Sequence, residues 1–158
     1  MSVSLQLPVQ CALCGSVFDG TTQITVCTQC GGLLDAVIDT TQRLTPESFD
    51  APRYTLESLS GVWRYRQLLP QIADEHIVSR REGNTPLYWH DAIATYAGMN
   101  PGQLGVKHEG HNPTGSFKDR GMTVAVSHAK SVGASVIACA STGNTSASLA
   151  SYAATAGI

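Results

Sequence analysis

The most informative segment of this 158-residue chain is Lys107-His-Glu-Gly-His-Asn-Pro-Thr-Gly-Ser-Phe-Lys118-Asp-Arg-Gly121. Pro113 and Gly115 predict a tight turn within it. We expect a strand over residues 104–109 before the turn and a helix over residues 116–130 after it. The segment therefore predicts a strand, a polar turn and a helix in immediate succession.

Lys118 falls in the first turn of the predicted helix, which the hydroxyl of Thr114 or Ser116 can cap. A helix N-terminus and the neighbouring Arg120 both disfavour a protonated amine. A neutral amine is what a Schiff base with an aldehyde cofactor requires. Lys118 is therefore the candidate catalytic residue, and the alternative is a solvated lysine beside Asp119 on an exposed turn.

The chain beyond this helix continues the same pattern. Gly133 ends the helix, residues 134–140 predict a strand with β-branched residues, and residues 145–156 predict a helix rich in Ala and Ser. This succession favours an α/β fold built from right-handed βαβ units in a parallel sheet. Cys139 is expected to be a small buried residue of the second strand.

The loop between that strand and that helix is Ser141-Thr142-Gly143-Asn144-Thr145. It brings hydroxyls, backbone N–H groups and an amide to the carboxyl end of a strand, where open α/β sheets bind ligands. The start of a helix also offers free N–H groups to a carboxylate or a phosphate. We interpret the loop as an anion-binding site, with ordinary helix capping as the alternative.

Four of the five cysteines form two Cys-x-x-Cys-Gly motifs, through Cys11, Cys14, Cys27 and Cys30. A gap of two residues lets both thiolates of a pair reach one tetrahedral ion at about 2.3 Å. The glycine after each motif can adopt the positive φ of a tight turn. These features predict a structural zinc ion in a zinc-ribbon-like β module. The alternative is a metal-free module that folds on a small apolar core.

The chain divides by composition into a zinc-ribbon-like module of residues 1–40, a linker of residues 41–60 and an α/β part of residues 61–158. A formal net charge of -2 argues against a nucleic-acid partner. Apolar runs fall short of the ~20 residues of a membrane span and no secretion signal is visible, so we expect a cytoplasmic protein without a membrane partner. Gly157 resembles a helix C-cap and Ile158 the start of a strand, which predicts a truncated catalytic domain.

Several segments together resemble the threonine synthase family within the fold-type II (tryptophan synthase β-like) enzymes that use pyridoxal 5'-phosphate (PLP). They are Trp63-Arg-Tyr65 before Leu68-Leu-Pro70, Glu82-Gly-Asn-Thr-Pro-Leu87, His111-Asn-Pro-Thr-Gly-Ser-Phe-Lys-Asp-Arg-Gly121 and Ser141-Thr-Gly-Asn-Thr145. The similarity extends from the cysteine module to the last residue. The family's Gly-rich loop for the PLP phosphate does not occur in it, so we expect these residues alone to be inactive.

The resemblance implies a PLP-dependent lyase that converts O-phospho-L-homoserine and water to L-threonine and phosphate. Lys118 would hold PLP as a Schiff base and later move protons, and Asn144 would hydrogen-bond the ring hydroxyl oxygen of the cofactor. Ser141, Thr142, Gly143 and Thr145 would bind the substrate carboxylate. The full-length protein is expected to be a homodimer.

Two other functions stay open on the sequence alone. Threonine or serine dehydratases that use PLP share residues 83–87 and a Ser-Phe-Lys loosely with this chain. A zinc-ribbon interaction module on a degenerate α/β scaffold would bind no PLP. Release of phosphate from phosphohomoserine or of ammonia from threonine separates the two enzymes, and PLP absorbance separates both from the interaction module.

Overall fold

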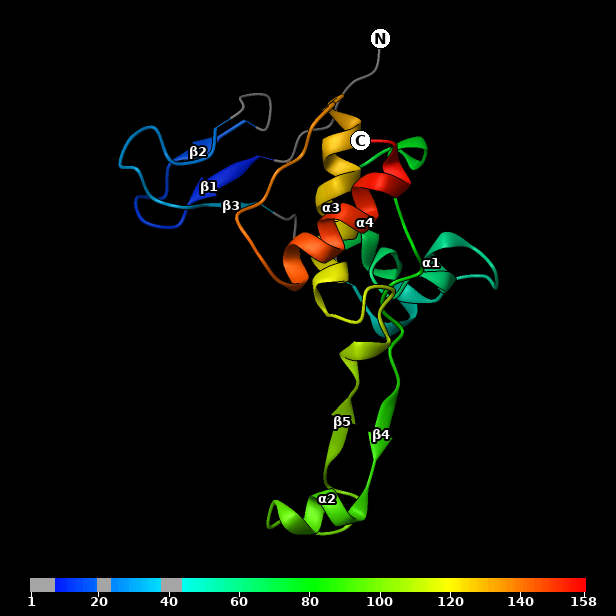
Figure 1. The fold of residues 1–158 in the computed structure, drawn as a ribbon. Helices are drawn as coiled ribbons and strands as arrows, with labels where there is room; N and C mark the ends of the chain where they lie inside the picture. Colours follow the sequence, from blue (N-terminus) through cyan, green and yellow to red (C-terminus); the bar gives the residue numbers. More distant parts are fainter. Residues whose placement is uncertain (1–7, 20–23, 38–43) are drawn as a thin grey trace.

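The computed structural model describes residues 8–19, 24–37 and 44–158 (Figure 1). The cysteine motifs lie on a small antiparallel sheet with the strand order β2-β1-β3. Its strands are β1 (Val9–Cys11), β2 (Val17–Phe18) and β3 (Leu34–Ala36). A small antiparallel sheet is therefore present in the part of the chain where the sequence predicted a β module. Residues 1–7, 20–23 and 38–40 of the predicted module and residues 41–43 of the predicted linker lie outside the described residues.

Two long helices, α3 (Lys118–Ser131) and α4 (Asn144–Ala156), pack against each other and enclose an apolar core. Val126 and Tyr152 are fully buried in this core, and each such side chain contributes about 1.5–3 kcal/mol by leaving water. α4 is capped by Gly157, whose φ of 76° is a left-handed conformation that glycine adopts without strain. Both helices confirm the sequence prediction to within two residues.

Short helices precede this pair along the chain. They are the 3-10 helices η1 (Pro46–Phe49), η2 (Trp63–Leu68) and η3 (Asp74–His76) and the α-helical turn α1 (Leu56–Leu59). Trp63 fixes this region to α3, because its buried Nε1 donates a hydrogen bond to Thr123 Oγ1 at 2.8 Å. Among the residues that the structure describes, none of the helices has the length and apolar character needed to cross a bilayer.

A hairpin-like arm projects away from the helices in Figure 1. It consists of β4 (Leu87–Trp89), the short helix α2 (Asp91–Tyr96) and β5 (Gly105–Lys107), and it returns to the body through the 3-10 helix η4 (Glu109–His111). The predicted strand of residues 104–109 is present in a shorter form. It pairs with β4 in an antiparallel arrangement, and the predicted parallel pairing with residues 134–140 is not present among the described residues.

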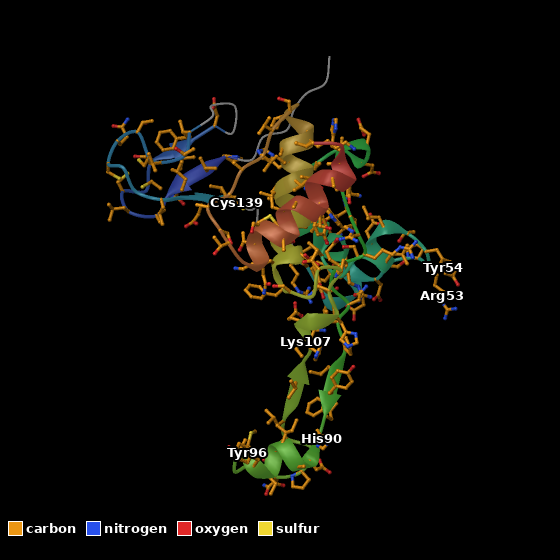
Figure 2. The ribbon with its side chains drawn as sticks, viewed as in Figure 1. Arg53, Tyr54, His90, Tyr96, Lys107 and Cys139 are labelled. Carbon is orange, nitrogen blue, oxygen red and sulfur yellow. The ribbon has the colours of Figure 1, made fainter. Side chains whose placement is uncertain are left out.

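Residues 134–140 form no strand in the described part of the chain, which corrects the second predicted strand. A strand needs a neighbour that pairs its backbone N–H and C=O groups, and no described strand pairs with this segment. Cys139 is accordingly exposed, not buried as predicted. In Figure 2 it lies on the connection between α3 and α4.

Two backbone segments cross at Gly61 and Gly83 without room for a side chain. A β-carbon on Gly61 would lie 2.1 Å from the backbone nitrogen of Asn84 and 2.7 Å from the carbonyl carbon of Gly83. The amide of Gly61 also donates to the carbonyl oxygen of Glu82 at 2.7 Å. This contact holds the start of η2 against the segment that leads into the arm.

Gly61→Ala is therefore expected to lower the free energy of unfolding by about 1–3 kcal/mol, because the added methyl group forces the two backbones apart. Urea unfolding measures the change. Gly121→Ala is the control, since Gly121 lies in α3 and, apart from its chain neighbours and the nearby backbone of that helix, no described atom lies within 4 Å of an added β-carbon. That substitution is expected to stabilise the protein, by up to about 1 kcal/mol. Equal effects of the two substitutions would contradict the close approach.

Candidate functional site

The candidate site lies where two helices begin. Lys118 is the first residue of α3 and Asn144 is the first residue of α4. The two helices run side by side with their N-terminal ends at the same end of the pair (Figure 1). The structure thus brings together the two loops that the sequence indicated. The cysteine cluster belongs to the separate small sheet and not to this site.

Lys118 is half-buried, and its Nζ lies 4.4 Å from the centroid of the Phe117 ring. That distance is within the range of a cation–π contact. Phe117 occupies the N-cap position, and the Ser116 hydroxyl oxygen accepts the Lys118 amide at 3.3 Å. The Ser116 hydroxyl therefore accepts an amide at the helix start, as predicted, although Ser116 lies one residue before the N-cap position. Thr114, the other predicted cap, serves Asp119 instead.

Asp119 is a fully buried carboxylate that sequence reasoning did not assign to the site. Its Oδ2 accepts the Thr114 amide at 2.7 Å, and its Oδ1 accepts the hydroxyls of Thr114 and Ser148, each at 2.5 Å. Thr114 belongs to the turn before Lys118, whereas Ser148 belongs to α4. One carboxylate therefore ties the turn that carries the lysine to the second helix.

A second network joins the arm to α3 through Glu109 and Arg120. Arg120 Nε and Nη2 donate to the two oxygens of Glu109 at 2.7 and 2.8 Å, which is a bidentate ion pair. Thr85 and Asn112 also donate to this carboxylate, and Asn112 Oδ1 accepts the Gly83 amide at 2.9 Å. The hydrogen bonds from Arg120 are the main reason that the pKa of Glu109 falls to about 2. The network thus joins Glu109, before the turn that leads to Lys118, to Arg120, two residues after Lys118.

The stability that Glu109 provides should depend on pH. Its pKa in the folded protein lies below the ordinary 4.5, so its contribution is complete above about pH 4.5 and is lost as the pH falls toward 2. Glu109→Gln is expected to cost about 1–2 kcal/mol at neutral pH and progressively less below pH 4.5. Urea midpoints across this range measure the difference. Glu75→Gln, at an exposed carboxylate, serves as the control; a Glu109 effect that is independent of pH would contradict the ion pair.

The loop of residues 141–145 is open to solvent. Thr142, Gly143 and Asn144 are exposed, while Ser141 and Thr145 are half-buried. The Gly143 amide donates to the Ser141 hydroxyl at 3.2 Å, and the first amides of α4 have no helical partners by construction. The loop therefore presents hydroxyl and amide side chains and the free N–H groups of a helix start at an open surface. Within the described part of the chain, no hydrogen bond joins Lys118 to this loop.

The four paired cysteines converge on one point of the small sheet. Their sulfur atoms all lie within 4.8 Å of one another, with Cys11–Cys30 at 3.5 Å and Cys14–Cys27 at 3.6 Å. A tetrahedral ion with Zn–S bonds of about 2.3 Å needs sulfur atoms about 3.8 Å apart, so the spacing fits. The glycine after each motif has a positive φ, of 73° for Gly15 and 74° for Gly31, as the sequence predicted.

The charges of the cluster also favour a cation. The hydroxyl of Ser16 is the main reason that the pKa of Cys14 falls to about 6, and the amide of Cys14 is the main reason that the pKa of Cys11 is lowered. The amide of Gly32 favours the thiolate of Cys30, but the sulfur atoms around it outweigh that effect and raise its pKa to about 12. Cys30 would therefore keep its proton without a metal, and a bound cation would be needed to neutralise four thiolates this close together.

Residues 78–158 match the family model described as pyridoxal-phosphate dependent enzyme, and this stretch includes Lys118 and the 141–145 loop. The chain belongs to this family of PLP-dependent enzymes. Its membership agrees with the lysine at the start of α3 and with the open loop at the start of α4.

Relatives of this PLP-dependent chain include several threonine synthases. It is 46% identical to the threonine synthase of Methanosarcina acetivorans over 154 residues, which is 95% of the chain and 35% of that relative. It is 46% identical to the enzyme of Methanocaldococcus jannaschii over 148 residues, 94% of the chain and 35% of that relative. A threonine synthase of Synechocystis is 53% identical over 94 residues, 60% of the chain and 24% of that relative. The chain thus spans about a third of the length of the first two relatives and about a quarter of the third.

The residues present fit PLP in two respects. The Lys118 amine is half-buried at a helix start, where an aldehyde can reach it, and Asn144 is exposed at the start of the adjacent helix. A lysine amine can hold PLP through its aldehyde, and a side-chain amide can donate a hydrogen bond to a ligand oxygen. Both residues lie within the stretch that matches the family model.

Proposed function

We propose that this chain is part of a threonine synthase, a PLP-dependent lyase that converts O-phospho-L-homoserine and water to L-threonine and phosphate. The observation that carries the proposal is the placement of Lys118 and the 141–145 loop at adjacent helix starts, joined by the buried Asp119. The similarity to threonine synthases over nearly the whole chain supports this substrate over those of the dehydratases.

Each loop has its own task in this proposal. Lys118 would hold PLP covalently and would move protons at the Cα and Cβ atoms of the substrate. PLP would supply an electron sink for the negative charge that these proton transfers create. Asn144 would donate a hydrogen bond to the cofactor ring. Ser141, Thr142, Gly143 and Thr145 bind the substrate carboxylate through hydroxyls and the free amides at the start of α4.

A protein of the relatives' length that contains residues 1–158, here called the long form, is the object in which this activity is proposed. In it, residues 134–140 would pair with further strands to give the parallel βαβ arrangement that the sequence favours. A homodimer and a cytoplasmic location stay predictions of the same kind.

An assay of the long form tests the proposal. We expect phosphate release from O-phospho-L-homoserine that depends on added PLP, with L-threonine as the second product. Ammonia release from L-threonine without phosphate release from phosphohomoserine would show a dehydratase instead. The absence of visible PLP absorbance would favour the zinc-ribbon interaction module on a degenerate scaffold.

We also propose that Cys11, Cys14, Cys27 and Cys30 hold a structural zinc ion. The support is the convergence of the four sulfur atoms and the positive φ of the glycines that follow. Four protein thiolates leave no open coordination position, so the ion would stabilise the small sheet and take no part in the chemistry.

Metal analysis of the purified protein is expected to find about one zinc per chain. Cys11→Ser should lose the metal and unfold the small sheet, because metal binding supplies much of the folding energy of such modules. The control is Cys139→Ser, which changes the exposed fifth cysteine and should retain full zinc content. Zinc-free protein with four freely titratable thiols, prepared without chelator, would contradict the proposal.

A further inference from the structure

We infer that Asp119 is a positioning residue that couples the lysine turn to the 141–145 loop. The inference rests on the proposed function, because it concerns how Lys118 and Asn144 keep a common geometry. Asp119 follows Lys118 directly in α3, and its carboxylate accepts hydrogen bonds from Thr114 on one side and from Ser148 on the other.

Because Asp119 is buried, the loss of a hydrogen bond to its carboxylate is energetically costly. Asp119 is 0% exposed, and a buried carboxylate is tolerated only when hydrogen bonds replace its lost water. The donors come from two elements, the turn before α3 and the second turn of α4. If either element moves, the carboxylate loses a donor that the other element cannot replace. The two elements are therefore held in one relative position.

The two residues that donate to Asp119 lie close in sequence to the two parts of the candidate site. Ser148 lies four residues after Asn144 in α4, so the two side chains share one face of that helix. Thr114 lies in the turn that delivers Lys118. A displacement of the 141–145 loop by a ligand is thus transmitted through Ser148 and Asp119 to the lysine.

Three variants of the long form separate positioning from stability. Ser148→Ala removes the donor from α4, and Asp119→Asn removes the charge with little change of shape. The matched control is Ser127→Ala. Ser127 is an equally buried serine of α3 that accepts the Val78 amide at 2.8 Å and donates to Thr123 O at 2.6 Å, without contact to Asp119. The readouts are the rate at which PLP becomes trapped on Lys118 by borohydride, the pH midpoint of the visible PLP band, and the thermal midpoint of unfolding.

We expect Ser148→Ala to slow trapping of PLP on Lys118 by about tenfold, because the substitution removes one hydrogen bond to a charged group. The same variant should shift the pH midpoint of the visible band. Asp119→Asn should have a larger effect if it folds. Ser127→Ala should lower the thermal midpoint similarly but change the trapping rate by about twofold at most. If Ser148→Ala and Ser127→Ala gave the same trapping rate and the same pH midpoint of the visible band, the inference would be overturned. The proposed function would stand in that case, provided that the wild-type protein still traps PLP on Lys118. Wild-type protein that forms no adduct on Lys118 would overturn both.

Discussion

Lys118→Ala is expected to reduce phosphate release from O-phospho-L-homoserine by about 10³-fold or more in the long form. The substitution removes the covalent attachment of PLP and the group that moves protons, and proton transfer by a positioned side chain alone contributes about 10²–10⁴-fold. PLP should still bind weakly, because Asn144 and the loop at the start of α4 are unchanged. Steady-state rates at saturating PLP measure the loss.

Lys130→Ala is the matched control for this experiment. Lys130 lies near the far end of α3, about three turns from Lys118, and its Nζ donates to the carbonyl oxygen of Glu75 at 3.0 Å. Its removal should leave the rate near that of the wild type. Normal turnover by Lys118→Ala would mean that another group does the work assigned to Lys118.

Glu82→Ala is expected to lower the free energy of unfolding by about 3–5 kcal/mol, which is a large share of the 5–15 kcal/mol that holds a typical domain together. Glu82 is 0% exposed. Its carboxylate accepts hydrogen bonds from the hydroxyls of Ser60, Ser79 and Tyr152 and from the amide of Arg80, at 2.5, 3.0, 2.8 and 2.9 Å respectively. Alanine leaves these buried donors without a partner and opens a cavity.

The Glu82 network connects three segments, namely the residues before η2, the residues before the arm and α4. Burial and the Glu82 carboxylate together raise the pKa of Tyr152, so its hydroxyl stays a donor at every working pH. Urea unfolding measures the cost of the substitution. Glu75→Ala, at an exposed carboxylate of η3, should change stability by about 0.5 kcal/mol or less. Similar values for the two variants would contradict the central place of Glu82.

Local patterns in the sequence predicted the two long helices and the cysteine cluster well. Gly157 marks the end of α4 because its positive φ suits glycine, and the spacing of the cysteines forces their sulfur atoms together. Lys118 could be singled out because the turn around it has distinctive chemistry. These features depend on residues that are near one another in the chain, so they can be predicted from the sequence without knowledge of the tertiary structure.

Features that depend on distant partners could not be predicted in the same way. Asp119 and Glu82 are charged, which in a sequence indicates the surface, yet both are fully buried by donors up to 70 residues away. The prediction of a strand at residues 134–140 was wrong for a related reason, because a strand forms only where another strand pairs with its backbone. A parallel partner is by nature distant in the sequence, and the described chain offers none.

Reduction of the PLP-loaded long form with borohydride, followed by peptide mapping, tests the central claim most directly. Residues 1–158 contain three lysines, which are Lys107, Lys118 and Lys130. Lys107 lies in β5 with its Nζ hydrogen-bonded to the carbonyl oxygen of Thr85, and Lys130 lies far along α3. We expect the reduced adduct on Lys118 and on neither of the others. An adduct mapped to Lys107, to Lys130 or to a lysine outside these residues would contradict the assignment of Lys118.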